Sequence, residues 1–507
     1  MPEINHIKRA TVHNLFAAYR YDVLFGLFLQ VVLFVNSILS VRILGLRGFG
    51  EYAVLGSLPV LLPIVIQRGN SEALVRFLPG VKNDPYAMQR IVLRVMLENI
   101  LFFVPVSLLL LLFHDRIFKW LDLQQVSGAV LWILLSTVFF GVIQVPLQRY
   151  LRVTLDNFFL NISLVVERCV IIVGFYLLFF LGLVSVKNLL LIAAVGHGVV
   201  ALLLLCRFLF VNRKEICLRL AGSRMGVPGF YSYSHKMFVY SLLNYLASKR
   251  GAVYFIQIFI GPTAVAVFNL VEQLTDKGLS VVVPKSLNVM INIASIEVKD
   301  EHGNNALHDF LYKYFVLNSI ARFFFLVFLV ANVRWIMNLY GVDIDEWKYF
   351  FVSYLFFFCA LSLVDVLRKF IFLDRRVEFF AYIVIVNFLI ALFLFSQFLQ
   401  YGLHVIPLVF VLQIFVEFFI CIVSFDDLKN FVIYHFRNIF ELLFLLFSML
   451  CFILFFIFQG YNVVILNILS FFSVFCFLWL LYLISNAETK SMMLNFFIRL
   501  KNFFIFS

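Results

Sequence analysis

The hydrophobic pattern along the chain consists of long apolar runs separated by short polar joins. Each run is continuously apolar over about 20 residues, which is the length of a membrane-spanning helix, whereas the strands of a membrane barrel would alternate apolar and polar residues. The pattern therefore predicts an all-α integral membrane protein with about fourteen spanning helices. The predicted spans are residues 23–44, 49–67, 91–113, 126–147, 158–182, 187–211, 237–260, 263–290, 314–337, 348–370, 378–399, 403–425, 439–458 and 462–484.

Two segments of the apolar pattern resemble each other and suggest an internal repeat. Gly45–Tyr52 and Gly261–Phe268 both follow an apolar helix, and both read glycine, three residues, apolar, small, any residue, aromatic. A parallel duplication of six helices is typical of some transporter folds. We therefore expect two six-helix lobes around a central cavity. The N-lobe spans 23–211, the C-lobe spans 237–425, residues 212–236 join them, and the last two helices at 439–484 are appended.

Composition and charge agree with a membrane protein. The 507 residues are 64% hydrophobic and only 13% charged, against about 25% charged in soluble proteins. The net charge of +12 does not indicate nucleic-acid binding, because most basic residues lie in short joins. Lys and Arg are several times more abundant in alternate joins, which predicts that both termini are cytoplasmic. Residues 1–22 are expected to form a basic segment at that surface, and residues 485–507 a cytoplasmic tail.

Several charged residues lie near the predicted midpoints of spans, where a charge costs roughly 2.5–3.5 kcal/mol on insertion scales. Such residues usually face an internal cavity, so the chain is predicted to be a transporter of something polar. The cations expected to line a substrate-binding cavity are Lys249, Arg250, Arg168 and Arg322. Two alternatives stay open for them. Lys249 or Arg250 could pair with a carboxylate on the next span and hold the lobe together, and Arg322 could extend toward the membrane surface.

The acidic residues of the spans suggest a second role. Glu272 and Asp276 are one helical turn apart and share a face. They could bind a proton for coupling, or form a static charge network with Lys277. Glu417 is a candidate counter-ion of the cavity. No catalytic residue, metal site or cofactor is predicted.

Two further residues of the spans are assigned to helix contacts. Glu167 precedes Arg168 and points about 100° away from it around the helix, so it is expected to meet another helix. His197 is either a weak proton relay or a hydrogen-bonded packing residue.

Three stretches carry a resemblance to a known family. Arg42–Leu55 and Gln67–Arg76 resemble the N-terminal hallmark of Wzx-type polysaccharide repeat-unit flippases, and Gly261–Pro284 is similar to the corresponding part of their second half. These flippases belong to the multidrug/oligosaccharidyl-lipid/polysaccharide exporter superfamily. The resemblance implies a non-enzymatic transporter that moves undecaprenyl-pyrophosphate-linked oligosaccharide, for O-antigen of lipopolysaccharide or for capsule, across the bacterial inner membrane by alternating access. It also implies contact with membrane lipids, a polysaccharide polymerase and a chain-length regulator.

Two other functions remain as alternatives. A cation-coupled exporter of small molecules or drugs would have the same fold, although the predicted cationic cavity favours an anionic substrate. An integral-membrane glycan polymerase or ligase would also have many helices. Such enzymes typically carry a large periplasmic loop, whereas every predicted outside join of this chain is short.

Overall fold

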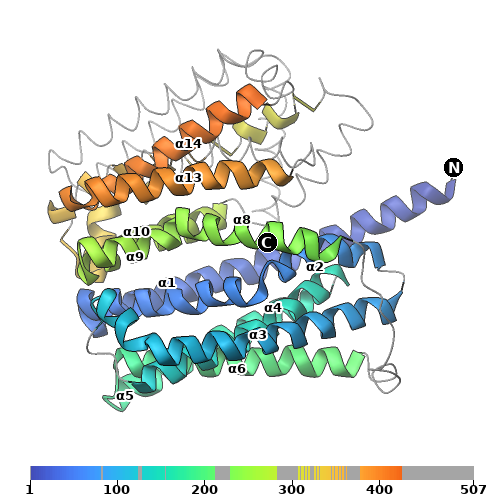
Figure 1. The fold of residues 1–507 in the computed structure, drawn as a ribbon, viewed down its shortest axis with the longest axis horizontal. Helices are drawn as coiled ribbons and strands as arrows, with labels where there is room; N and C mark the ends of the chain where they lie inside the picture. The colour runs from blue at the N-terminus through green and yellow to red at the C-terminus, as the bar shows by residue number, and fades with distance from the viewer. Residues whose placement is uncertain are drawn as a thin grey trace, which may run out of the picture.

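The computed structural model describes residues 2–81, 84–123, 128–154, 156–211, 229–282 and 377–424, together with individual residues between 307 and 361. Figure 1 shows long helices that run side by side, with the start of the first helix extending beyond the bundle. Helices α3–α6 lie on one side of α1, and α8–α10 lie on its other side, with α13 and α14 beyond them. Helix α1 therefore lies between the earlier and the later helices of the chain.

The helices in the first part of the described chain follow the predicted spans closely. They are α1 (Pro2–Gln67), α2 (Asn70–Phe77), the 3₁₀ helix η1 (Leu78–Val81), α3 (Pro85–Trp120), α4 (Gly128–Val153), α5 (Asn157–Phe180) and α6 (Val186–Val211). Helix α1 contains the first two predicted spans and turns at Gly45 (φ 70°, ψ 170°). The backbone of the predicted basic N-terminal segment continues this helix.

The later helices complete the described elements. They are α8 (Phe230–Ala247), α9 (Lys249–Phe259), α10 (Pro262–Val282), α13 (Val377–Phe398), the 3₁₀ helix η2 (Leu399–Tyr401) and α14 (Val405–Ser424). Over the described residues, six helices are long and apolar enough to cross a membrane. The prediction of a helical membrane protein is thereby confirmed. The predicted spans 439–458 and 462–484 and the tail lie outside the described residues, so fourteen helices and the lobe boundaries stay predictions.

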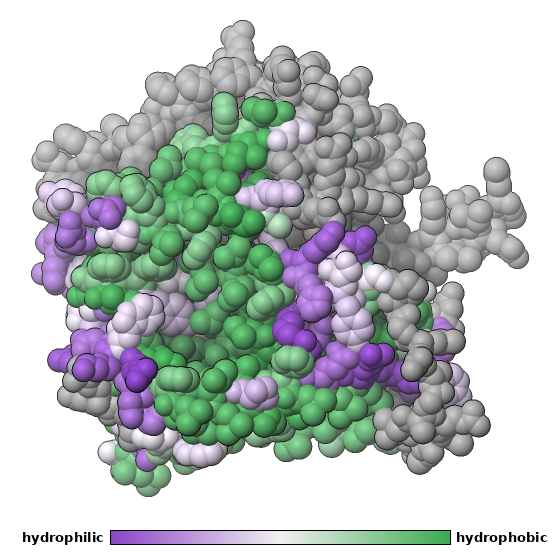
Figure 2. Space-filling model, in the orientation of Figure 1, coloured by the Kyte–Doolittle hydropathy of each residue, from purple (hydrophilic) through white to green (hydrophobic). Residues whose placement is uncertain are grey.

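The surface of the bundle matches a lipid environment. Figure 2 shows a broad hydrophobic area with hydrophilic residues gathered on either side of it along the helix direction. Large apolar side chains such as Leu112, Phe180 and Phe419 are mostly exposed. In water such a surface would drive association, whereas in a bilayer it faces acyl chains of similar polarity.

The two glycines of the proposed repeat have the same structural role. Gly45 and Gly261 both adopt positive φ, 70° and 115°, and both turn the chain from one helix into the next. The segments also meet, because a Cβ built on Gly50 would lie 1.8 Å from the backbone oxygen of Pro262. We call this the Gly45 end of the bundle. The close approach of α1 and α10 thus requires a residue without a side chain at position 50.

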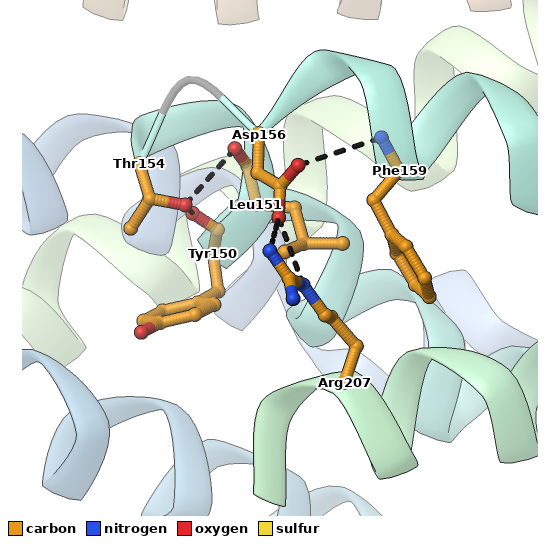
Figure 3. A network of polar contacts seen from close by, with 6 residues as sticks. All are labelled: Tyr150, Leu151, Thr154, Asp156, Phe159 and Arg207. Carbon is orange, nitrogen blue, oxygen red and sulfur yellow. Dashed lines mark hydrogen bonds and ion pairs between the residues drawn. The ribbon is translucent and has the colours of Figure 1, made fainter. Parts of the chain in front are cut away.

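A charged contact joins the start of α5 to the far part of α6 (Figure 3). The Asp156 carboxylate caps α5 by accepting a hydrogen bond from the Phe159 backbone N–H at 3.4 Å. Its other oxygen accepts from Arg207 Nε at 3.1 Å and from Nη2 at 2.9 Å. One side chain therefore satisfies a helix terminus and fixes the distance between two neighbouring helices.

Replacing Asp156 with alanine should destabilise the protein more than the same change at Asp84. Asp84 caps α3 by accepting from Ala87 N at 3.0 Å, and no ion pair of Asp84 occurs in the described part of the chain. Loss of a cap costs about 1 kcal/mol, and the Arg207 pair adds up to about 1 kcal/mol because both side chains are partly exposed. Thermal unfolding of the two variants in detergent measures the difference. Equal melting temperatures would contradict a stabilising role for Arg207.

Candidate functional site

The span predicted at 237–260 is not one helix, and this changes the setting of its two cations. The chain leaves helical geometry at Ser248 (φ −86°, ψ 174°), which ends α8 and begins α9. Lys249 and Arg250 therefore lie at the N-terminus of a second helix and not in the middle of a continuous one. At a rise of 1.5 Å per residue, the break is roughly 17 Å from either end of the predicted span.

Local hydrogen bonds explain why the chain breaks here. The Ser248 hydroxyl donates to the Tyr245 carbonyl oxygen at 2.7 Å and accepts from the Arg250 backbone N–H at 3.3 Å. Serine is a favoured N-cap because its short side chain can replace the missing intrahelical partner. Gly251 permits the tight geometry, since a Cβ there would lie 2.2 Å from the Leu246 backbone oxygen. The Ser-Lys-Arg-Gly sequence therefore encodes the break.

The break is anchored to α1. Tyr245, on the α8 side, donates a hydrogen bond from its hydroxyl to the Ser57 carbonyl oxygen at 3.0 Å. The same hydroxyl lies 3.5 Å from that of Tyr254 on α9. This polar contact joins α8 and α9 to α1. It holds the break next to α1, which lies between the earlier and the later helices.

Lys249 has a partner on the next helix. Its Nζ lies 2.9 Å from Asp276 Oδ1 on α10, and its side chain is only 16% exposed. The ammonium also lies 5.4 Å from the ring centre of Phe357 and 5.8 Å from that of Tyr354, within cation–π range. The pairing alternative considered from sequence therefore describes Lys249 in this conformation.

Arg250 differs from its neighbour. Its side chain is exposed, and no carboxylate pairs with it in the described part of the chain. It projects from the first turn of α9, where the backbone N–H groups of a helix start carry partial positive charge. An exposed guanidinium, a helix N-terminus and the nearby ammonium of Lys249 together make this point of the bundle attractive to an anion.

The other predicted residues are placed separately. Arg168 on α5 is partly exposed, with Nη2 3.4 Å from Glu167 Oε1, and no side-chain contact among the described residues joins it to Lys249 or Arg250. Arg322 is buried, donates from Nε to Asn318 Oδ1 at 3.3 Å, and lies over the Phe358 ring. Glu417 on α14 is also buried. Their roles in a substrate cavity remain proposals.

The predicted acidic pair is divided between two environments. Asp276 is half exposed and pairs with Lys249, whereas Glu272 is half-buried and within electrostatic range of the same ammonium. The Lys277 side chain lies outside the described residues. The predictions from sequence did not include Ser248 and Gly251. A capping residue followed by glycine inside an apolar run nevertheless indicates that a helix can end and restart there.

Contacts between earlier and later parts of the chain occur at both ends of the bundle. At the Gly45 end, Arg42 donates from Nε to the Leu339 carbonyl oxygen at 2.6 Å and from Nη2 to that of Asn338 at 2.8 Å. At the opposite end, a Cβ on Gly69 would lie 2.1 Å from the Ser234 backbone oxygen. The Ser234 hydroxyl is 2.7 Å from Asn70 Oδ1. Earlier and later parts of the chain are therefore in contact on either side of the Ser248 break.

Solved structures with the same fold are membrane transporters. A lipid II flippase MurJ in an inward closed conformation superposes with a TM-score of 0.65 at 12% identity, covering 92% of this chain and 98% of that one. An outward-facing multidrug resistance MATE transporter of the MOP superfamily gives 0.57 at 15% identity, covering 85% and 96%. An inward-facing MATE transporter gives 0.55 at 16% identity, covering 81% and 94%. No curated protein matches the sequence.

The family comparison covers more than half of the sequence. Residues 21–291 match the family described as polysaccharide biosynthesis protein. This region runs from residue 21 within α1 to beyond the end of α10 and therefore includes the broken helix with its cations. The predicted transporter fold is confirmed by these structures, and the family match places the chain among polysaccharide biosynthesis proteins. By this match, and by the transporter fold that it shares with MurJ and the MATE proteins, the chain belongs to the polysaccharide biosynthesis protein family.

Proposed function

We propose that the protein flips an undecaprenyl-pyrophosphate-linked oligosaccharide, an O-antigen or capsule repeat unit, from the cytoplasmic to the periplasmic leaflet of the inner membrane. The observation that carries this proposal is the break at Ser248, which presents the exposed Arg250 guanidinium and a helix N-terminus deep in the membrane region. MurJ, whose fold this chain shares, is a lipid II flippase, and this supports a lipid-linked substrate. A pyrophosphate is the anionic part of such a substrate.

The physical task of a flippase is to carry polar groups across hydrocarbon without covalent chemistry. Hydrogen bonds from Arg250 and backbone N–H groups would replace the water lost by the pyrophosphate, and charge-assisted bonds of this kind are about twice as strong as neutral ones. Lys249 would add a second cation if the substrate displaced Asp276, whose side chain is 53% exposed. Arg168 and Arg322 would complete the cationic cavity as other helices rearrange.

The contacts at the two ends fit alternating access. Opening the Gly69 end would admit a headgroup from the cytoplasmic side, and opening the Gly45 end would release it on the other. Contacts at both ends are a few hydrogen bonds and close backbone approaches, which can be exchanged at modest cost. Glu272, Asp276, Lys277 and Glu417 would then couple this exchange to protons or serve as counter-charges.

Ligand-induced stabilisation of the purified protein tests the substrate class. A ligand that binds only the folded state stabilises it by about 2.7 kcal/mol when the free ligand concentration is 100 times the dissociation constant. We expect a polyprenyl-pyrophosphate-linked oligosaccharide to raise the melting temperature in detergent, and the same glycolipid without pyrophosphate to have little effect. Equal stabilisation by both lipids would contradict the role of the pyrophosphate. Stabilisation by cationic drugs alone would favour the exporter function.

A further inference from the structure

A buried acid and a partly buried base face each other away from the Ser248 break. Glu167 on α5 is 3% exposed, and its Oε2 lies 4.0 Å from Nδ1 of His197 on α6. Neither residue contacts Lys249 or Arg250 in the described part of the chain. A buried carboxylate in a membrane region is costly and is usually kept for a function.

The packing of α5 against α6 creates this pair. Gly196 precedes His197, and a Cβ there would lie 3.1 Å from Ile171 Cγ1 and 3.4 Å from the Glu167 backbone oxygen. Small residues allow membrane helices to approach closely. On the other side, Gln144 of α4 donates from Nε2 to the His197 carbonyl oxygen at 2.6 Å. The backbone at His197 is therefore held by contacts from two neighbouring helices, close to the Glu167 carboxylate.

Both facing groups have unmet hydrogen-bonding capacity. Glu167 Oε1, the oxygen on the Arg168 side of the carboxylate, and His197 Nδ1 are buried and have no hydrogen-bond partner. The 4.0 Å separation of Nδ1 from Oε2 is too long for a hydrogen bond. A buried polar atom without a partner is destabilising, because it has lost its hydrogen bond to water. A proton on Glu167 Oε2, with an approach of about 1 Å, would give the orphaned Nδ1 of a neutral imidazole a hydrogen-bond donor.

The surrounding charges favour a proton over a metal cation. In the described part of the chain, the charged and titratable groups around Glu167 are Arg168 on its own helix and His197 on α6. Tyr52 of α1 lies within electrostatic range of Arg168, and α4 contributes the uncharged Gln144. A metal ion beside Glu167 would meet the positive charge of Arg168, whose Nη2 is 3.4 Å away.

We propose that Glu167 and His197 form a proton-binding site that controls Arg168. When the pair is deprotonated, the Glu167 carboxylate attracts the Arg168 guanidinium. When the carboxylate takes up a proton, that attraction weakens and the partly exposed guanidinium becomes available to an anion. The proton is taken from solvent and returned to it, so no bond other than O–H or N–H changes. The use of Arg168 for a pyrophosphate rests on the proposed function, whereas the proton site does not.

Infrared spectroscopy of the full chain in lipid tests the proton site directly. A protonated carboxylic acid has a carbonyl stretching band that a carboxylate lacks, and the spectrum is recorded between roughly pH 3.5 and pH 8, which covers the ordinary pKa values of glutamic acid and histidine. We expect a band that appears on acidification and is missing from Glu167→Gln. The matched control is Glu51→Gln, at a carboxylate on α1 that pairs with Arg47, and it should keep the band. A band unchanged in Glu167→Gln would overturn the proposal.

A second variant keeps the test decisive if Glu167→Gln does not fold. His197→Gln removes the base and should shift the pH midpoint of the carboxylic acid band, whereas an unchanged midpoint would overturn the shared site. Flipping assays separate the two proposals. A titrating band in a protein that does not flip lipids would support the proton site and contradict the proposed function. Flipping without any Glu167 band would support the function and contradict the proton site.

Discussion

Liposomes that contain the Lys249→Ala/Arg250→Ala variant are expected to flip polyprenyl-pyrophosphate oligosaccharide at least about tenfold more slowly than those with the wild type. Hydrogen bonds to charged groups contribute about 1.5–3 kcal/mol, and each 1.4 kcal/mol is a factor of ten. Arg250 is the exposed cation at the helix break, and Lys249 is the second cation there. Removing both leaves only backbone N–H groups to receive the pyrophosphate at the break itself. The rate is measured from the accessibility of a fluorescent substrate in the outer leaflet.

Two controls separate the position of the charges from their number. Arg116→Ala/Lys119→Ala removes the same net charge from exposed positions near the end of α3 and should flip at the wild-type rate. Arg250→Lys keeps a cation at the break and should retain much of the activity, although a point charge lacks the two-pronged geometry of a guanidinium. Wild-type flipping by the Lys249→Ala/Arg250→Ala protein would assign these cations a structural role.

Gly50→Ala is expected to lower the melting temperature strongly and to disfavour closure at the Gly45 end. The new Cβ would lie 1.8 Å from the Pro262 oxygen and 2.6 Å from its carbonyl carbon. Both are backbone atoms, so α1 and α10 must separate to relieve the overlap. Overpacking of this kind costs about 1–3 kcal/mol, and occasionally more. Thermal unfolding in detergent measures the loss of stability.

The same helix supplies the control for this substitution. Gly56 lies on α1, and nothing lies within 4 Å of a Cβ built on it. Gly56→Ala should therefore leave stability unchanged or raise it slightly, because alanine is the better helix former. A Gly50→Ala protein as stable as Gly56→Ala would mean that α1 and α10 are not in close contact in the membrane.

Hydropathy was sufficient to predict the helical spans of the described chain, but it could not locate the break in the seventh. A continuous apolar run looks the same whether it forms one helix or two. The information was local instead. It lay in the Ser248 cap and in Gly251, where a side chain would overlap the Leu246 carbonyl oxygen. Reading the run for caps as well as for apolarity would have moved Lys249 and Arg250 to a helix start.

The pairing of the charged residues could not be predicted, because it depends on contacts between helices that the spacing of residues in the sequence does not determine. The Lys249–Asp276 pair was one of two open alternatives, because helix periodicity gives the face of each residue and not the rotation of the next helix. Glu167 was expected to meet another helix, and it meets His197 only because Gly196 lets α6 approach α5. Tertiary packing therefore decided which charges are neutralised and which remain available.

The most direct test of the account is transport by the wild-type protein in proteoliposomes, with a polyprenyl-pyrophosphate oligosaccharide and the same glycolipid without pyrophosphate compared side by side. The account predicts that the pyrophosphate-linked lipid crosses the bilayer faster than in protein-free liposomes, and that the uncharged lipid does not. Absence of flipping by folded protein, with or without a proton gradient, would contradict the proposed function. Equal flipping of both lipids would contradict recognition of the pyrophosphate.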